Sequence, residues 1–440
     1  MNPSTAPVAH VAVHATEALL YFTLLQLAVI VLFSRIGNEL AARCGQSRVV
    51  GEIIIGILLG PSLFGLLAPD VFHYVFRSSA PEPMMMLSQI GLIFLMFQIG
   101  LEFDFSHLKA ADNRRAVLLV AAAGLIFPFG LGLVFGYYTA PVLSPAANSW
   151  ASALFIATAF SITALPILGR IMIEFNMTRT KLGVIAISAA AINDVVGWLL
   201  LAVVTALAVS HFSALDFLGK LGLLAVYVAV CWMIVRPFLH RAIARSVVSE
   251  HRFSANLFGL IIVAIFISAM ATYKLGIFAI FGGFMLGVLL HDQPAVVSAW
   301  RHKAGDFVTV FFLPIFFTYT GLRTDIGGLN SASLWGWCLL LITLATLGKL
   351  GGCYWGARIA GLGPTQARII GIMMNTRALM ELIIINVGFD LGVISQNVFT
   401  MLVLMAIFST VITTPALRRW LPAAGIPTRA GVPGAAAVAE

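Results

Sequence analysis

The sequence predicts an all-α integral membrane protein with about thirteen transmembrane helices, two inverted five-helix repeats and crossed, discontinuous helices. Hydrophobic residues make up 60% of the 440 residues and charged residues only 10%. Apolar stretches long enough to cross a bilayer recur along the chain, and two pairs of short motifs recur at almost the same spacing. A soluble domain carries about 25% charged residues, so this composition excludes a water-facing globular protein.

The expected helices follow the apolar stretches in chain order. Charged and turn-forming residues separate one stretch from the next, as at Lys274. The first basic residue is Arg35, so the first stretch lacks the charged start of a secretory signal and is expected to be a retained helix. The helices are expected at residues 18–34, 49–67, 85–103, 116–138, 149–173, 182–209, 217–235, 255–272, 275–290, 307–322, 334–357, 366–389 and 397–416.

The basic residues predict the orientation of these helices. Of the 26 Lys and Arg residues, 20 fall in the loops after odd-numbered helices or in the C-terminal tail, and four fall on the other side. Basic loops stay in the cytoplasm. Residues 1–17 are therefore expected outside, residues 18–416 form the membrane domain, and residues 417–440 form a disordered cytoplasmic tail. The net charge of +8 is a topology signal and does not indicate nucleic-acid binding.

Two pairs of motifs predict the inverted repeat. Their spacing relates helices 2–6 of the expected series to helices 9–13. Inverted repeats are typical of secondary transporters, although GxxxG motifs also occur wherever membrane helices pack closely. The pairs are Gly100-Leu101-x-x-Asp104 with Gly321-Leu322-x-x-Asp325, and Gly56-x-x-x-Gly60 with Gly283-x-x-x-Gly287.

Asp194 is the residue that points most directly to ion transport. It lies 13 positions after Lys181, which is about 20 Å at helical rise and close to the middle of the bilayer. A carboxylate at this depth costs several kcal/mol, so it is a functional candidate by default. Burial favours the protonated form and a bound cation favours the carboxylate, so one site can hold either ion. The alternative is a structural Asp that pairs with a neighbouring Lys.

Three further charged residues are expected to compensate charge around Asp194. Lys349 can neutralise Asp194 when no cation is bound, or can pair with a helix end. Arg377 and Glu381 are four positions apart in helix 366–389, so we expect them to form an ion pair on one helical face. Glu52 lies near a helix end and is expected to hold helices together.

Two expected helices, at residues 149–173 and 366–389, are predicted to be interrupted beside Asp194. In helix 149–173, Pro166 removes a helical hydrogen bond just after three hydroxyl residues. Irregular backbone at membrane depth lines a cavity or lies buried in protein, where it can offer oxygens to a cation. Kinked but continuous helices are the alternative. The expected ion-binding residues at the interruptions are Thr158, Ser161, Thr163, Asn375 and Thr376.

Four stretches of the chain resemble the cation:proton antiporter-2 family, which includes Kef-type bacterial transporters and plant cation/proton exchangers. They are VVGEIIIGILLGPSLFG, FLMFQIGLEFDFSHL, SAAAINDVVGWLLL and MNTRALMELIIINVG. The similarity covers about residues 18–416. It implies Asp194 as the carrier and ligand of the metal cation, Asn193 beside it in the ion site, and the crossing at helices 149–173 and 366–389.

The resemblance also implies a sodium/proton antiporter fold and a homodimer. A core domain would move as an elevator against a dimer domain built from the remaining helices. In the expected series of thirteen, the core helices are numbers 3, 5 and 6 from the first repeat and numbers 10, 12 and 13 from the second, at residues 85–103, 149–173, 182–209, 307–322, 366–389 and 397–416.

The chain departs from the family pattern at Asn193. Relatives that move two protons per sodium have two adjacent carboxylates, and Asn193 occupies the first of these positions. The lysine that pairs with that carboxylate matches Lys349, so the partner of Lys349 stays open. The chain ends shortly after its last expected helix, so we expect no nucleotide-binding domain in cis.

The expected function is exchange of a monovalent cation, Na⁺ or K⁺, for protons, with a role in pH homeostasis. The protein is expected in the plasma (inner) membrane, without enzymatic activity, resident cofactor or nucleic-acid partner. One titrating carboxylate predicts electroneutral exchange. The alternatives are a sodium-coupled symporter of a small organic anion on the same fold, which the Asn193-Asp194 pair disfavours, and a channel or sensor without coupled transport.

Overall fold

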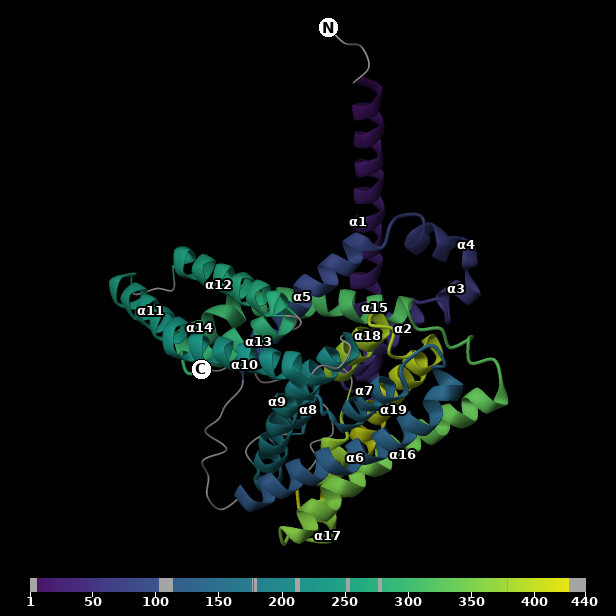
Figure 1. Cartoon of the computed structure of the whole chain (residues 1–440), viewed down its shortest axis with the longest axis vertical. Coiled ribbons are helices and arrows are strands. Elements are labelled where there is room, and N and C mark those ends of the chain that lie inside the picture. The colour runs from purple at the N-terminus through teal and green to yellow at the C-terminus, as the bar shows by residue number, and fades with distance from the viewer. Residues whose placement is uncertain are drawn as a thin grey trace. The chain divides into compact units, whose positions relative to one another are not determined.

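The computed structural model describes residues 6–102, 114–175, 177, 180–209, 214–250, 254–275, 279–377 and 379–426 (Figure 1). These residues form helices and no β-strand. Among them, eight helices are long and apolar enough to span a membrane, or nine if the bent pair Pro294–Gly305 and Val308–Leu322 is one span. The all-α membrane fold is therefore confirmed. The count of thirteen stays a prediction, because several expected spans are short or interrupted.

The chain divides into two compact units. The first consists of Met1–Gly37, Glu52–Asp104 and Thr205–Gly327. Its helical elements, in chain order, are most of α1 (Ala6–Arg43), most of α2 (Arg48–Leu58), α3 (Phe64–Leu67), α4 (Pro69–Phe72), η1 (His73–Arg77), α5 (Glu82–Leu101), α10 (Ala214–Val230), η4 (Cys231–Val235), α11 (Arg236–Glu250), α12 (Ala255–Lys274), α13 (Ala279–Leu290), α14 (Pro294–Trp300), η5 (Arg301–Gly305), η6 (Val308–Phe312) and α15 (Leu313–Leu322).

Within the first unit, the repeated glycine motifs make equivalent contacts. Gly60 of α2 lies against the carbonyl of Gly321 in α15, and Gly321 lies against the carbonyl of Gly56. In the same way, Gly100 of α5 and Gly287 of α13 lie against each other's backbone. A side chain at these positions would collide with main-chain atoms. The GxxxG motif of each repeat thus packs against the GLxxD motif of the other repeat, as a symmetric repeat would require. The repeat itself stays a prediction.

The second unit consists of Asn38–Gly51, Phe105–Val204 and Gly328–Glu440. Four of its helices begin at a side-chain cap, supplied by Asn148, Thr180, Ser331 and Ser395. Its helices are α6 (Arg114–Leu143), α7 (Ser149–Ser161), α8 (Leu165–Glu174), α9 (Lys181–Val209), α16 (Ala332–Ile359), α17 (Pro364–Met374), α18 (Leu379–Asp390), α19 (Gln396–Trp420) and the short η7 (Pro422–Ala424).

The compact units group the helices differently from the expected core domain, which stays a prediction. The expected helices 85–103 and 307–322 belong to the first unit, and α6 and α16 join the second unit in their place. The physical reason is close packing: α6 and α16 lie side by side (Figure 1), and α6 also packs along α7. Gly352 of α16 lies against the α6 backbone, and Gly132 of α6 lies against Ala157 of α7. Motion of one unit against the other stays a prediction.

The chain ends differ from the expected domain boundaries. Helix α1 already begins at Ala6, within the segment expected to precede the membrane domain. At the other end, α19 continues to Trp420, beyond the expected boundary at residue 416. Asp104 of the first repeated motif, residues 1–5 and residues 427–440 of the expected tail lie outside the described residues.

Candidate functional site

Both expected helix interruptions are present in the second unit. Helix α7 ends at Ser161 and α8 begins at Leu165. The residue after α7, Ile162, has an extended backbone with φ −80° and ψ 152°. Helix α17 ends at Met374 and α18 begins at Leu379, and residue 378 in this second interruption lies outside the described residues. The alternative of kinked, continuous helices is therefore wrong at both places.

The two interruptions are hydrogen-bonded to each other. The backbone N–H of Ala164 donates to the carbonyl of Thr376 at 2.9 Å. The hydroxyl of Thr163 donates to the carbonyl of Met374 at 3.2 Å. Backbone groups that lack a helical hydrogen bond at one interruption thus bond partly to groups at the other interruption. This confirms that the discontinuous helices meet at their breaks.

Side chains satisfy the carbonyls at the end of α7. The last four carbonyls of a helix have no partner within it, and together they carry a partial negative charge. In α7 all four accept a side-chain hydrogen bond, and two of the three donors are cations. The bonds run from Ser161 Oγ to Thr158 O (2.9 Å), from Arg377 to Ala159 O (3.0 Å) and Phe160 O (2.8 Å), and from Lys349 Nζ to Ser161 O.

Lys349 is bound by three uncharged oxygens. Besides the Ser161 carbonyl, its buried ammonium donates to the carbonyl of Gly124 at 2.8 Å. In the amide orientation that satisfies both ends of Asn193, Nδ2 donates to Ala121 O at 3.0 Å and Oδ1 accepts from Lys349 at 3.2 Å. These three acceptors match the three protons of an ammonium group. Lys349 therefore pairs with the end of α7, and its expected role in neutralising Asp194 stays a prediction.

Arg377 and Glu381 form the expected ion pair, but they do not lie on one continuous helix. Nη1 of Arg377 lies 3.2 Å from Oε1 of Glu381, and both side chains are buried. Arg377 lies in the interruption before α18, so the two residues do not share a helical face as predicted. This position lets the guanidinium also reach the carbonyl of Ala345 in α16, at 3.0 Å. Glu381 lies in the first turn of α18, where the helix dipole favours an acidic side chain.

Asp194 is a buried carboxylate without a hydrogen-bond partner among the described residues. Its relative exposure is 1%, and neither oxygen accepts a hydrogen bond there. It interacts electrostatically with Lys349 and with the backbone amide of Leu165, although neither contact has hydrogen-bond geometry. Leu165 is the first residue of α8, so the carboxylate lies at a helix end with partial positive charge. A proton or a cation would relieve the cost of this buried, unpaired charge.

The other expected ion ligands are buried at the interruptions. The hydroxyls of Thr158, Ser161 and Thr163 donate to backbone carbonyls, so their orientation is fixed. The amide of Asn375 and the hydroxyl of Thr376 have no hydrogen-bond partner among the described residues. Buried polar atoms are costly without a partner, so these two side chains are the better candidates for a bound ion. Their role as ligands stays a prediction.

Two contributions to the site were missed at the sequence level. Gly124 supplies a carbonyl to Lys349, and Thr410 of α19 donates to the carbonyl of Arg377 at 3.0 Å. The Ser409-Thr410 pair within an apolar helix was an available signal. A backbone carbonyl such as that of Gly124 leaves no signal in sequence. Among the described residues, no group of three or more His, Cys, Asp and Glu side chains could hold a metal ion.

The chain is similar to known cation/proton antiporters. The family described as "Sodium/hydrogen exchanger, transmembrane" matches residues 28–422. The Na(+)/H(+) antiporter NhaS4 of Synechocystis sp. is 39% identical over 92% of this chain and 98% of its own length. Cation/H(+) antiporter 17 of Arabidopsis thaliana is 34% identical over 91% of this chain, which spans about half (48%) of that relative. K(+)/H(+) antiporter 1 of Saccharomyces cerevisiae is 29% identical over 84% of the chain.

A solved structure has the same fold. The sodium proton antiporter MjNhaP1 from Methanocaldococcus jannaschii at pH 8 superimposes with a TM-score of 0.63. The match covers 90% of this chain and 95% of the other, at 15% sequence identity. This likeness confirms the expected antiporter fold class.

Proposed function

The chain belongs to the sodium/hydrogen exchanger family, and we propose that it exchanges a monovalent cation, Na⁺ or K⁺, for a proton, with Asp194 carrying either ion. The observation that carries the proposal is the buried carboxylate of Asp194, which accepts no hydrogen bond from a described residue. In the membrane interior such a group is neutral when it binds a proton or when it pairs with a cation. The two ions therefore compete for one site, and this competition couples their movement.

Uncharged oxygens at the helix crossing complete the proposed cation site. Asn375 and Thr376 lie in the interruption whose backbone is bonded to Ala164, next to the Leu165 amide that Asp194 faces. Carbonyl, amide and hydroxyl oxygens can replace the hydration shell of a monovalent cation. The names of the relatives include both Na⁺ and K⁺, so both ions stay in the proposal. Family membership gives no support to the organic-anion symporter.

The stoichiometry follows from the neighbours of Asp194. Asn193 does not titrate, so it cannot carry a second proton. Lys349 is held by three oxygens, and the nearby Asp194 carboxylate opposes loss of its proton. One carboxylate then trades one proton for one cation, and no net charge crosses the membrane.

The remaining parts of the proposal concern the whole assembly. We infer a homodimer in the inner membrane from the resemblance to the antiporter family. The N-terminus would lie outside and the C-terminus in the cytoplasm, because the basic residues favour that orientation. The unit that carries Asp194 would move as an elevator relative to the other unit. A role in pH homeostasis follows from exchanging protons for a cation.

Proton flux in liposomes tests the proposed function. Purified protein is reconstituted with a pH-sensitive dye inside, and Na⁺, K⁺, Li⁺ and Rb⁺ are added separately. We expect a proton flux with Na⁺ or K⁺ that disappears in Asp194→Asn. Asp70→Asn, which changes an exposed carboxylate, is the matched control and should exchange normally. Full activity of a well-folded Asp194→Asn protein would overturn the proposal.

Voltage dependence tests the stoichiometry separately. Liposomes are held at defined membrane potentials with valinomycin, and the cation gradient at which proton flux reverses is measured for a transported ion such as Na⁺. Electroneutral exchange predicts a reversal point that does not move with voltage. A voltage-dependent reversal point would contradict 1:1 exchange, and Lys349 would become the first residue to replace.

A further inference from the structure

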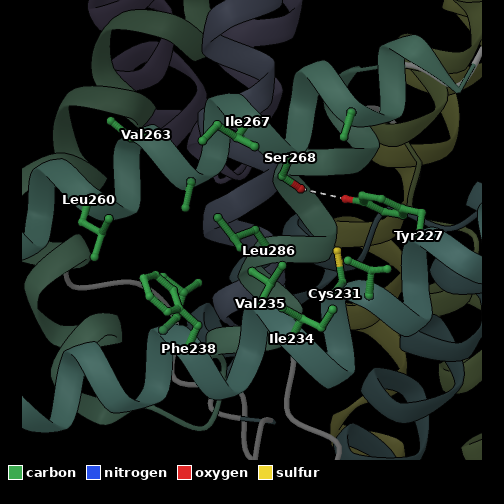
Figure 2. A pocket seen from close by; sticks show the side chains of 14 residues that line it. Tyr227, Cys231, Ile234, Val235, Phe238, Leu260, Val263, Ile267, Ser268 and Leu286 are labelled. Carbon is green, nitrogen blue, oxygen red and sulfur yellow. Dashed lines mark hydrogen bonds between the residues drawn. The ribbon is translucent and has the colours of Figure 1, made fainter.

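The first unit contains an apolar groove far along the chain from Asp194. It has a volume of about 350 Å³ and lies between the continuous α10–η4–α11 rod and α12, with Leu286 of α13 at its base (Figure 2). Its walls are aliphatic and aromatic side chains. Ile234, Phe238 and Ile267 on these walls are 57–63% exposed, so the groove is open along its side. At one end, the hydroxyls of Tyr227 and Ser268 are hydrogen-bonded at 2.7 Å and close it (Figure 2).

The length of the groove matches one leaflet of a bilayer. Its lining residues run from Tyr227 to Leu239 on one side and from Leu260 to Ala271 on the other. At helical rise these stretches measure about 18 Å and about 17 Å. The hydrocarbon core is about 30 Å thick, so one leaflet occupies about 15 Å. The groove is therefore long enough to hold one acyl chain of a single leaflet.

Two arginines follow the groove-lining residues along α11. The lining residues of the α10–α11 rod recur every three or four positions, as residues on one helical face do. Continuing that spacing past Phe238 leads to Arg241 and then Arg245, which are both exposed. These arginines thus lie one and two turns beyond the apolar lining. This end of α11 is also the end expected at the cytoplasmic surface.

The neighbouring acid does not neutralise these arginines. Asp292 is bound to Arg236 at 2.5 Å and lies 3.4 Å from His240. Partial burial raises the pKa of Asp292, but the Arg236 hydrogen bond and the nearby His240 lower it more, so it stays ionised against these partners. Arg236 also stacks on the exposed ring of Trp232, at 4.6 Å. Trp and Arg together are typical of the headgroup layer.

We propose that this groove binds an anionic phospholipid, with one acyl chain between α11 and α12 and the phosphate on Arg241 and Arg245. Apolar walls of one leaflet's length fit the chain, and the two arginines fit the headgroup. A second copy of this protein fits less well. In a symmetric dimer within a membrane, both copies have the same orientation, so the basic ends of the two grooves would face each other and repel.

Lipid retention by the full-length protein tests the proposal. The purified protein is incubated in detergent with phosphatidylglycerol or phosphatidylcholine, and the bound lipid and melting temperature are measured by native mass spectrometry and thermal unfolding. We expect phosphatidylglycerol to be retained and to raise the melting temperature more than phosphatidylcholine does. Inorganic phosphate without acyl chains should have neither effect. Equal retention of both lipids, or protection by phosphate alone, would overturn the proposal.

Two variants separate the headgroup from the acyl chain. Arg241→Ala/Arg245→Ala should weaken phosphatidylglycerol binding about thirtyfold and leave phosphatidylcholine unchanged. Arg114→Ala/Arg115→Ala, which removes an exposed arginine pair at the start of α6, is the matched control and should bind like wild type. Ala264→Trp fills the groove and should abolish retention of both lipids.

A lipid-facing substitution outside the groove controls for the added bulk of Ala264→Trp. Met270 of α12 is 59% exposed and does not line the groove, so Met270→Trp should retain lipid normally. If Ala264→Trp does not fold, Ala271→Phe at the deep end replaces it, with the same expected loss. If these variants retain lipid but dissociate a dimer in light scattering, the groove is a protein interface and the lipid proposal is wrong.

Discussion

At the interruption between α7 and α8, two cations hold the carbonyls of the ending helix, whereas at the interruption between α17 and α18 uncharged groups do. Arg377 and Lys349 bind the last three carbonyls of α7. At the end of α17 the donors from the described part of the chain are two backbone N–H groups and one hydroxyl. These bonds run from Asn375 N to Gly371 O and Ile372 O, from Thr376 N to Met373 O, and from Thr163 Oγ1 to Met374 O.

Both helix ends have free carbonyls that need hydrogen-bond donors, but the donors are cations at α7 and uncharged groups at α17. The end of α7 has a fixed positive charge on it, which leaves no need for a transported cation there. Among the described residues, no cation bonds the carbonyls of the second interruption, and its Asn375 and Thr376 side chains have no hydrogen-bond partner there. We therefore infer that the first interruption supplies the constant charge, while the second faces the charge that changes during transport.

The largest expected effect follows from removing the cation that caps α7. Arg377→Met would leave three buried carbonyls without this donor and Glu381 without its ion-pair partner. Breaking a buried ion pair on one side costs about 3–5 kcal/mol, so we expect a large loss in the free energy of unfolding, measured by SDS titration. Arg358→Met is the control, because exposed Arg358 bonds a single carbonyl.

A double variant separates the cap from the ion pair. In Arg377→Met/Glu381→Gln the uncompensated carboxylate is removed, but the carbonyls of Ala159 and Phe160 still lose their donor. We expect the double variant to regain only part of the lost stability. Full recovery would mean that Arg377 serves Glu381 alone, and the contrast between the two interruptions would lose its basis.

A smaller effect is expected at the second interruption. Asn375→Ala and Thr376→Val should each weaken the apparent affinity for the transported cation about tenfold, because each removes one proposed oxygen ligand from a charged ion. The free energy of unfolding should change little, since neither side chain bonds a described residue. The measurement is the cation concentration at half-maximal proton flux in liposomes. Unchanged values in both variants would remove these residues from the ion site.

The sequence was sufficient to predict those features that cost free energy in a membrane. Pro166 and the Asn375-Thr376 pair indicated the interruptions, and Asp194 indicated the site, because breaks and charges at this depth need a reason. The sequence suggested that Lys349 could pair with a helix end, but it did not predict that this end belongs to α7 or that Arg377 binds there too. Lys349 is in place because α16 packs on α6, and that contact joins segments more than 200 residues apart. For the same reason the sequence did not predict that α6 and α16 lie in one compact unit.

The smallest expected effect tests the neutral cap. Thr163→Val keeps the shape of the side chain and removes the hydroxyl that donates to Met374 O. Losing one uncharged hydrogen bond to a buried carbonyl costs about 1–2 kcal/mol, well below the cost at Arg377. Exchange should persist, because the Ala164 N–H still bonds Thr376 O and holds the interruptions together. Thr343→Val on α16, an exposed threonine that bonds its own helix, should change the free energy of unfolding by less than the Thr163 variant. If Thr163→Val destabilises the protein as much as Arg377→Met, charge does not distinguish the two helix ends, and their caps are equivalent.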